Sequence, residues 1–250
     1  MQKIFFVLFI ALAFSANAQT VYYAAAKTGI SLREMPNANA KLLDKVPYGG
    51  KVTTQLDTFP PSTIITEGFK GAWWKVEYNN KQGYVSSSYL LPVPPPKTGI
   101  KNLKDYFAQV SSALGDKLVI KKSDEALNEM GESTLTKQFF KNGMECQETQ
   151  AYESGSEVYV LPDFSVEQCF LLLRILNQYP DLIGEKDAFP VKKISTKNAE
   201  GEKIIDIERA DNDSRSPVRK IKISSTKAVV TEFEIFTLDQ QAVIFYSSGV

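Results

Sequence analysis

Four short pieces of sequence decide the fold of the N-terminal third of this chain. They read TGISLREMPN at residues 28–37, VPYGGKV at 46–52, WWKV at 73–76 and GYVSSSYL at 83–90. All four contain β-branched or aromatic residues, and three of them also contain glycine or proline, a composition typical of short strands joined by tight turns. Asn79-Asn80 fits a hairpin turn between the last two pieces, because asparagine tolerates a positive φ. The segment 57–72, which lies between the second and third pieces, is expected to be an extended loop, with a strand at residues 64–66.

This series of strands and turns resembles a bacterial SH3 domain (SH3b). The resemblance implies a small all-β, SH3-like barrel over residues 19–91 that binds a ligand rather than catalysing a reaction. Ligands of such domains include cell-wall peptides and proteins. Two departures from the usual pattern lie near the expected ligand face: Glu34-Met35-Pro36 and the long 57–72 segment.

The first 18 residues read as a signal peptide. Lys3 supplies the positive charge, residues 4–14 are apolar, and Ala16-Asn17-Ala18 gives a small-x-small cleavage pattern. The apolar run is short for a permanent membrane span. We therefore expect an exported chain, periplasmic or secreted, with no stable membrane insertion after cleavage.

Composition excludes several classes of function. The chain has 29 basic and 29 acidic residues, and Lys3 is the one charged residue that removal of the leader would take away. A neutral, interspersed charge pattern gives no reason to expect nucleic acid as a partner. Histidine is absent, which excludes Ser-His and Cys-His catalysis and the commonest zinc ligand. We expect no cofactor, no metal site and no catalytic residues.

A proline-rich linker, residues 92–99, separates the barrel from residues 100–250. It contains Pro92-Val93-Pro94-Pro95-Pro96, which is typical of a semi-rigid spacer. Beyond it, a helix capped by Asn102 precedes several strands, including a hairpin at Asn142-Gly143. A further helix after Ser123 is also expected.

The C-terminal part is predicted to be an α+β domain with an antiparallel sheet. Its central element would be an apolar helix that starts at a capping box formed by Ser165 and Gln168. In a later hairpin, Asp206 and Glu208 would pair across the solvent face with Lys220 and Lys222. No family resemblance is seen for residues 100–250.

The candidate ligand-binding residues are three aromatic side chains of the barrel. Strand alternation places Trp73 and Trp74 on opposite sides, and Trp74 shares its parity with Val76, which suits the core. Trp73 is then the candidate groove wall, with packing in the barrel as its alternative. Tyr84 and Tyr89 lie where SH3b domains carry aromatic residues near the ligand groove.

The two cysteines, Cys146 and Cys169, are a possible disulfide, since an oxidising compartment permits one. Two free buried thiols are the alternative.

Three functions remain open after these exclusions. The first is an exported, non-catalytic binding or adaptor protein that recognises a cell-wall peptide or an envelope protein. The second is a wall-directed enzyme whose C-terminal domain works without histidine. The third is an inhibitor or structural component of the envelope. A pocket lined by ionisable groups in the second domain would favour the enzyme, and a flat or apolar patch beside the barrel groove would favour partner binding.

Overall fold

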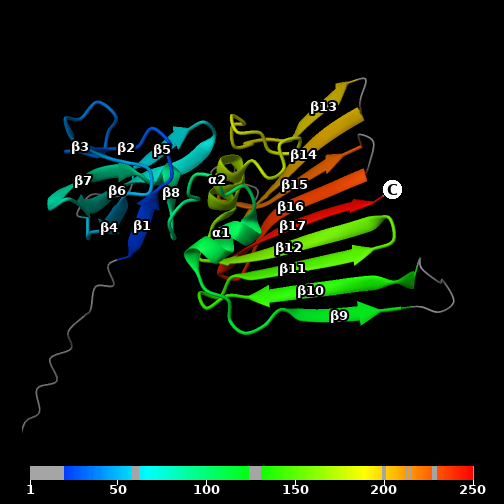
Figure 1. Cartoon of the computed structure of the whole chain (residues 1–250). Helices are drawn as coiled ribbons and strands as arrows, with labels where there is room; N and C mark the ends of the chain where they lie inside the picture. The colour runs from blue at the N-terminus through cyan, green and yellow to red at the C-terminus, as the bar shows by residue number, and fades with distance from the viewer. Residues whose placement is uncertain are drawn as a thin grey trace, which may run out of the picture.

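The computed structural model describes residues 20–57, 62–123, 131–198, 201–211, 213, 216–226 and 230–249. The predicted signal peptide, residues 1–18, and most of the helix expected after Ser123 lie outside these residues. Within them, the protein is mostly β, with two antiparallel sheets and two α-helices (Figure 1).

The N-terminal sheet, called here the SH3 sheet, contains eight strands and a 3₁₀ turn, η1. Its hydrogen-bonded order is β3-β2-β7-β6-β4-β1-β8, and β5 pairs with β6. This order is an open path, so the predicted closure into a barrel is not found. The elements are β1 (Val21–Ala24), β2 (Ile30–Arg33), β3 (Leu42–Val46), β4 (Lys51–Thr54), β5 (Thr63–Thr66), β6 (Phe69–Tyr78), β7 (Lys81–Ser86), η1 (Ser87–Tyr89) and β8 (Leu90–Leu91).

The predicted loop at 57–72 contains a hairpin made of β5 and the first part of β6. Thr63 pairs with Ala72 and Thr66 with Phe69. Glu67 and Gly68 form the turn with φ values of 50° and 81°, the left-handed conformation that two-residue hairpin turns require. Residues 58–61, which include Phe59-Pro60-Pro61, lie outside the described residues.

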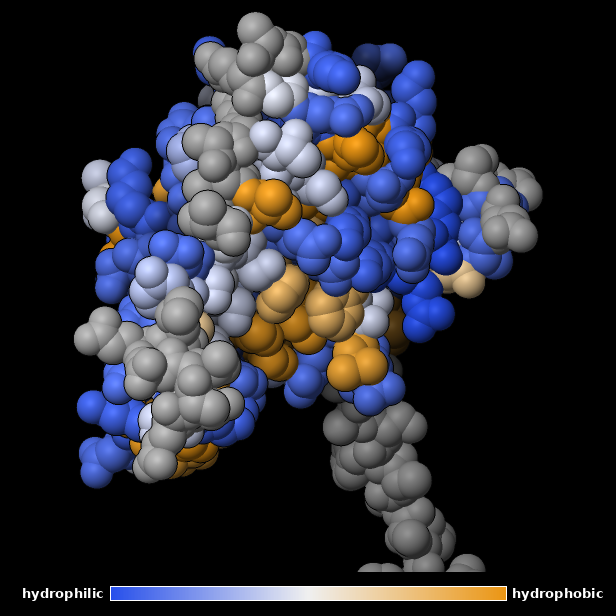
Figure 2. Space-filling model, turned by 90° about the vertical axis from the view of Figure 1, so that its right-hand side faces the viewer, coloured by the Kyte–Doolittle hydropathy of each residue, from blue (hydrophilic) through white to orange (hydrophobic). Residues whose placement is uncertain are grey.

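The C-terminal sheet contains nine strands in the order β13-β14-β15-β16-β17-β12-β11-β10-β9, all antiparallel. At one end of the molecule, the strands of this sheet extend well beyond the helices (Figure 1). Figure 2 views the molecule from that end and shows hydrophobic residues in the middle of this face, with hydrophilic residues around them. The elements are α1 (Leu103–Val110), β9 (Leu118–Lys122), β10 (Ser133–Phe139), β11 (Glu145–Ala151), β12 (Ser154–Pro162), α2 (Val166–Leu176), β13 (Ile194–Asn198), β14 (Gly201–Arg209), β15 (Val218–Ser225), β16 (Val230–Leu238) and β17 (Gln241–Gly249).

Helix α2 packs across β15, β16 and β17 on one face of this sheet. The prediction that this helix lies at the centre of the domain is therefore not shown. The capping box is confirmed: the Ser165 hydroxyl accepts from the Gln168 backbone N–H, and the Gln168 side chain accepts from the Ser165 backbone N–H. Asn102 caps α1 as predicted, since its side chain accepts from the Asp105 backbone N–H.

The charged ladder on β14 and β15 has the predicted register, with Asp206 opposite Lys222 and Glu208 opposite Lys220. The ion pairs that form are nevertheless different. Lys220 and Lys222 approach Glu234 and Glu232 of β16, each at 2.9 Å from nitrogen to oxygen. Lysines on β15 have acidic residues on both neighbouring strands, β14 and β16, and in the structure they pair with those of β16.

The hydrophobic core of the C-terminal sheet continues into the SH3 sheet. Ala25, Phe69 and Leu91 belong to the same buried cluster as α2. Gln168 at the start of α2 donates a hydrogen bond of 2.9 Å to the carbonyl of Leu90. The two sheets are thus joined by packing as well as by the chain.

The proline-rich segment is held along its length. Hydroxyl groups of Tyr106 and Tyr48 donate to the carbonyls of Pro94 and Pro96 at 3.0 and 2.8 Å, and Gln109 donates to Pro95 at 3.1 Å. Because Tyr106 is fully buried, this segment is fixed against α1.

Cys146 on β11 and Cys169 on α2 are free, buried thiols in the structure. Burial raises the pKa of the Cys146 thiol to about 12 and that of Cys169 further above its ordinary value. Since the thiolate is the reactive form, we expect thiol-specific reagents at pH 8 to react at least about a hundredfold more slowly with the native protein than with free cysteine.

Ellman's reagent checks this prediction. Unfolding in guanidinium without reductant should release two titratable thiols per chain. No titratable thiol after unfolding would show a disulfide instead.

Candidate ligand groove on the SH3 sheet

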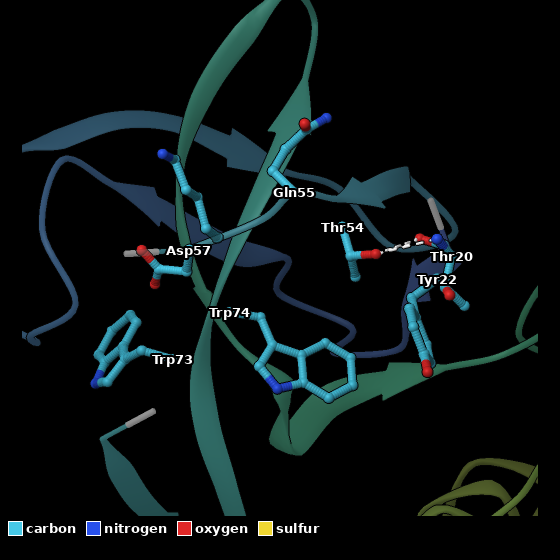
Figure 3. Close-up of a pocket in the computed structure, with 8 residues that line it drawn as sticks. Thr20, Tyr22, Thr54, Gln55, Asp57, Trp73 and Trp74 are labelled. Carbon is cyan, nitrogen blue, oxygen red and sulfur yellow. Dashed lines mark hydrogen bonds between the residues drawn. The ribbon is translucent and has the colours of Figure 1, made fainter. Parts of the chain in front are cut away.

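A pocket of about 290 Å³ opens beside β6 (Figure 3). We call it the aromatic slot. Its wall combines aromatic rings with hydroxyl, amide, carboxylate and ammonium groups, a mixture suited to orienting a polar ligand on flat apolar surfaces. Its lining residues are Thr20, Tyr22, Thr54, Gln55, Asp57, Trp73, Trp74 and Lys75.

Three segments of the SH3 sheet build the slot. Pairing of β1 with β4 and of β4 with β6 brings Tyr22 next to Trp74. Their rings meet edge to face, with centroids 4.8 Å apart, a geometry favoured by the ring quadrupoles. At the edge of the slot, the Thr20 backbone N–H donates to the Thr54 hydroxyl oxygen at 3.1 Å. The slot is therefore a preformed part of the sheet.

The two tryptophans project to different sides of β6, and both line the slot (Figure 3). Trp73, the predicted groove wall, is only 9% exposed. Trp74, assigned to the core by parity, is partly exposed and packs on the core with one side. Trp74 thus offers more accessible ring surface than Trp73.

Tyr84 supports the slot from behind. It is buried on β7 opposite Lys75, and its hydroxyl donates to the Asp57 carboxylate at 2.9 Å. Burial, and then this carboxylate, raise the pKa of Tyr84. The Tyr84 hydroxyl stays protonated at neutral pH and holds Asp57 at the slot.

Tyr89 lies elsewhere, at the boundary between the two sheets. Its ring packs against Phe69 at 5.8 Å between centroids. Burial, and then a hydrogen bond with Glu67, raise its pKa to about 12. Tyr89 lines a separate cavity of about 570 Å³ that also contains Arg174. The structure therefore brings Trp73 and Tyr84 to one site and leaves Tyr89 outside it.

A larger cavity, about 910 Å³, extends the slot toward the C-terminal sheet. It shares Thr20, Tyr22 and Trp74 with the slot. We call this the boundary groove. On the far side it is lined by Asp163 and by Glu167 of α2, whose pKa is raised by burial. Asp163 is close enough to contribute to the raised pKa of Tyr22, after burial.

Tyr22 and the polar lining residues of the slot were not predicted as site residues from the sequence, and Tyr22 is the aromatic one among them. Its neighbours across the sheet come from β4 and β6, which are distant in sequence. No local pattern identifies such a neighbour. Among the described residues, no group of three or more histidine, cysteine, aspartate or glutamate side chains is arranged to hold a metal ion.

Residues 28–90 match the family model of the bacterial SH3 domain. The match confirms the resemblance of the N-terminal third, and the matched residues include both tryptophans and Tyr84. Bacterial SH3 domains are a family of cell-wall binding modules. No curated protein and no solved structure matches the chain. None of the helices in the described ranges has the length and apolar character that crossing a membrane requires.

Proposed function

We propose that this protein is an exported, non-catalytic binding or adaptor protein whose aromatic slot recognises a cell-wall peptide. The single observation that carries the proposal is the slot itself, built by Tyr22, Trp73 and Trp74 largely within the segment that matches a wall-binding family. The absence of histidine from the chain supports a binding role over catalysis. Residues 1–18, with their signal-peptide pattern, support export.

The shape of the site favours an extended ligand. The slot and the boundary groove share the Tyr22–Trp74 pair, so one chain-like ligand can lie across both. Stacking surface comes from the rings, and polar side chains such as Gln55 and Asp57 can orient amide groups. A peptide of the wall has both the length and the alternating polar groups for this arrangement.

The test is co-sedimentation of the mature chain, residues 19–250, with insoluble cell wall. Trp74→Ala should weaken binding about tenfold or more, because truncating an aromatic residue central to a site commonly costs about 2 kcal/mol. Gln55→Ala, which removes a polar lining group and leaves the core intact, should weaken it less.

Tyr152→Ala is the matched control, since Tyr152 is an exposed aromatic residue in the turn between β11 and β12. It should bind as wild type does. Circular dichroism checks that each variant is folded. Equal sedimentation of all four proteins would contradict the wall proposal, and absence of sedimentation would direct the search to an envelope protein as the partner.

A further inference from the structure

Arg174, in the last turn of α2, has a guanidinium nitrogen without a hydrogen-bond partner. Its side chain is only 11% exposed. Nη2 donates to the Glu67 carboxylate at 2.9 Å, and Nε donates to the Glu185 carbonyl at 3.3 Å. Nη1 is buried, and no acceptor in the described part of the chain bonds to it. Because buried polar groups of native proteins are nearly always paired, this N–H requires an acceptor from outside the chain.

The contact of Arg174 with Phe69 does not satisfy this nitrogen. The central guanidinium carbon lies 5.3 Å from the centroid of the Phe69 ring, and a ring face is a much weaker acceptor than an oxygen atom. Together with the bonds to Glu67 and Glu185, this contact fixes the position of the guanidinium group. A cation held in this way is preorganised, so little side-chain entropy is lost when an anion binds to it.

Arg174 lines the cavity of about 570 Å³ that Tyr89 also lines. We call it the arginine cavity. Its volume is within the range of sites that hold small organic molecules. Leu171 and Ile175 of α2 contribute apolar surface, and Ser31 of the SH3 sheet contributes a hydroxyl group. The cavity can therefore surround an apolar body and offer polar partners to one end of it.

The charges around the arginine cavity match a single carboxylate. Its ionised lining residues are Lys27, Arg174 and Lys186 on the one hand and Glu67 and Glu185 on the other, so three positive charges and two negative ones leave one positive charge. A carboxylate carries one negative charge and accepts hydrogen bonds from arginine in its own plane. A phosphate group carries close to two negative charges at neutral pH and exceeds this balance.

Both contacts that Glu185 makes with these cations are weak. Its carboxylate lies 3.8 Å from the Lys27 ammonium group, and the two side chains are 46% and 64% exposed. Its carbonyl accepts from Arg174 at 3.3 Å, which is long for an N–H···O bond. Exposed ion pairs contribute little to stability. Glu185 can thus yield Lys27 and one side of the guanidinium group to a ligand.

We propose that the arginine cavity binds a carboxylate group carried on a short apolar body. The Arg174 guanidinium group is the inner donor, and the ammonium groups of Lys27 and Lys186 hold the carboxylate from the rim. A peptide C-terminus and a fatty acid share this chemistry. The site is separate from the aromatic slot and does not depend on what the slot binds. Because its lining comes from the SH3 sheet and from α2, a bound ligand stabilises their boundary.

The test is a nuclear magnetic resonance titration of the ¹⁵N-labelled mature chain, residues 19–250, with N-acetyl-leucine and with octanoate. Each acid is compared with its neutral amide. We expect both acids to bind with dissociation constants of about 1–10 mM, as ligands of this size do, and to shift the backbone signals of Gly29, Ser31 and Tyr89. The amides and inorganic phosphate should bind at least about tenfold more weakly. Tighter binding of N-acetyl-leucine indicates a peptide C-terminus, and tighter binding of octanoate indicates a fatty acid.

Two variants separate binding from folding. Arg174→Lys keeps the charge but lacks the planar donor group, and it should weaken binding of both acids at least about tenfold. The double variant Lys27→Gln with Lys186→Gln changes two exposed side chains, so it should fold as wild type does and weaken binding about three- to tenfold. The matched control, Lys101→Gln with Lys141→Gln, removes two exposed lysines outside the cavity and should bind as wild type does.

Circular dichroism checks the fold of each variant, and the double lysine variant decides the matter if Arg174→Lys does not fold. Equal binding of acids and amides would overturn the proposal. So would shifts confined to residues outside the arginine cavity, the absence of any shift at about 50 mM acid, or equal binding by the double lysine variant and its control.

Discussion

Replacing Phe69 by alanine is expected to lower the free energy of unfolding by about 3–5 kcal/mol, the usual cost of truncating a buried phenylalanine. Phe69 is fully buried at the tip of the β5–β6 hairpin. Its ring centroid lies 5.8, 6.0 and 5.4 Å from those of Tyr89, Phe170 and Phe189, and the Arg174 guanidinium lies 5.3 Å away. One side chain thus joins the SH3 sheet to the core of the C-terminal sheet.

Two probes in urea unfolding check this prediction. Both tryptophans of the chain belong to the SH3 sheet, so fluorescence reports that sheet, while far-ultraviolet circular dichroism reports the whole protein. We expect both transitions to move to lower urea in Phe69→Ala, because the core is shared. Phe139→Ala, at an exposed position, should change stability by less than about 1 kcal/mol. Equal small effects of the two variants would contradict a shared core.

Replacing Gly68 by alanine should be as damaging, with a loss of at least about 3 kcal/mol. Gly68 has a φ of 81°, and a Cβ added there would lie 2.1 Å from the carbonyl oxygen of Phe189. At this position the Phe189 backbone N–H also donates to the Glu67 carbonyl at 2.8 Å. Because backbone atoms cannot yield at so short a distance, the hairpin must withdraw, and the contacts of Phe69 are lost with it.

Gly49→Ala is the control for backbone strain alone. Gly49 has a similar φ of 76°, but an added Cβ would meet no atom within 4 Å. We expect it to cost roughly 1–2 kcal/mol, the penalty of a left-handed conformation. The same two unfolding probes measure both variants. If Gly68→Ala proved no worse than Gly49→Ala, the docking of the hairpin on Phe189 would be disproved.

Features with a local cause were predictable from the sequence. The capping box at Ser165 and Gln168 depends on residues three apart, and the turn at Asn142-Gly143 depends on two neighbouring residues; both are confirmed. The SH3 segment is also confirmed, because its glycine turns and short strands are encoded where they occur. Features that depend on residues close together in the chain can thus be predicted from a single sequence.

Features that depend on contacts between distant residues were not predictable. The β5–β6 hairpin was expected to be mostly loop, since Phe69 acquires its role only against Phe170 and Phe189. The short strand β13 was missed, because its polar residues carry no strand pattern of their own. Strand parity predicted that Trp73 and Trp74 differ, but their exposure also depends on Tyr22, which joins the slot across the sheet.

A nuclear magnetic resonance titration of the ¹⁵N-labelled mature chain with solubilised wall fragments is the direct test of whether the aromatic slot recognises the cell wall. The full mature chain is needed, because cutting it after the proline-rich segment would expose Phe69 and Leu91. We expect the indole N–H signals of Trp73 and Trp74 to shift on titration, and we expect the response to be lost in Trp74→Ala. Absence of any shift at millimolar fragment would contradict wall recognition, and shifts confined to Tyr89 and its neighbours would place binding in the cavity beside Arg174 instead.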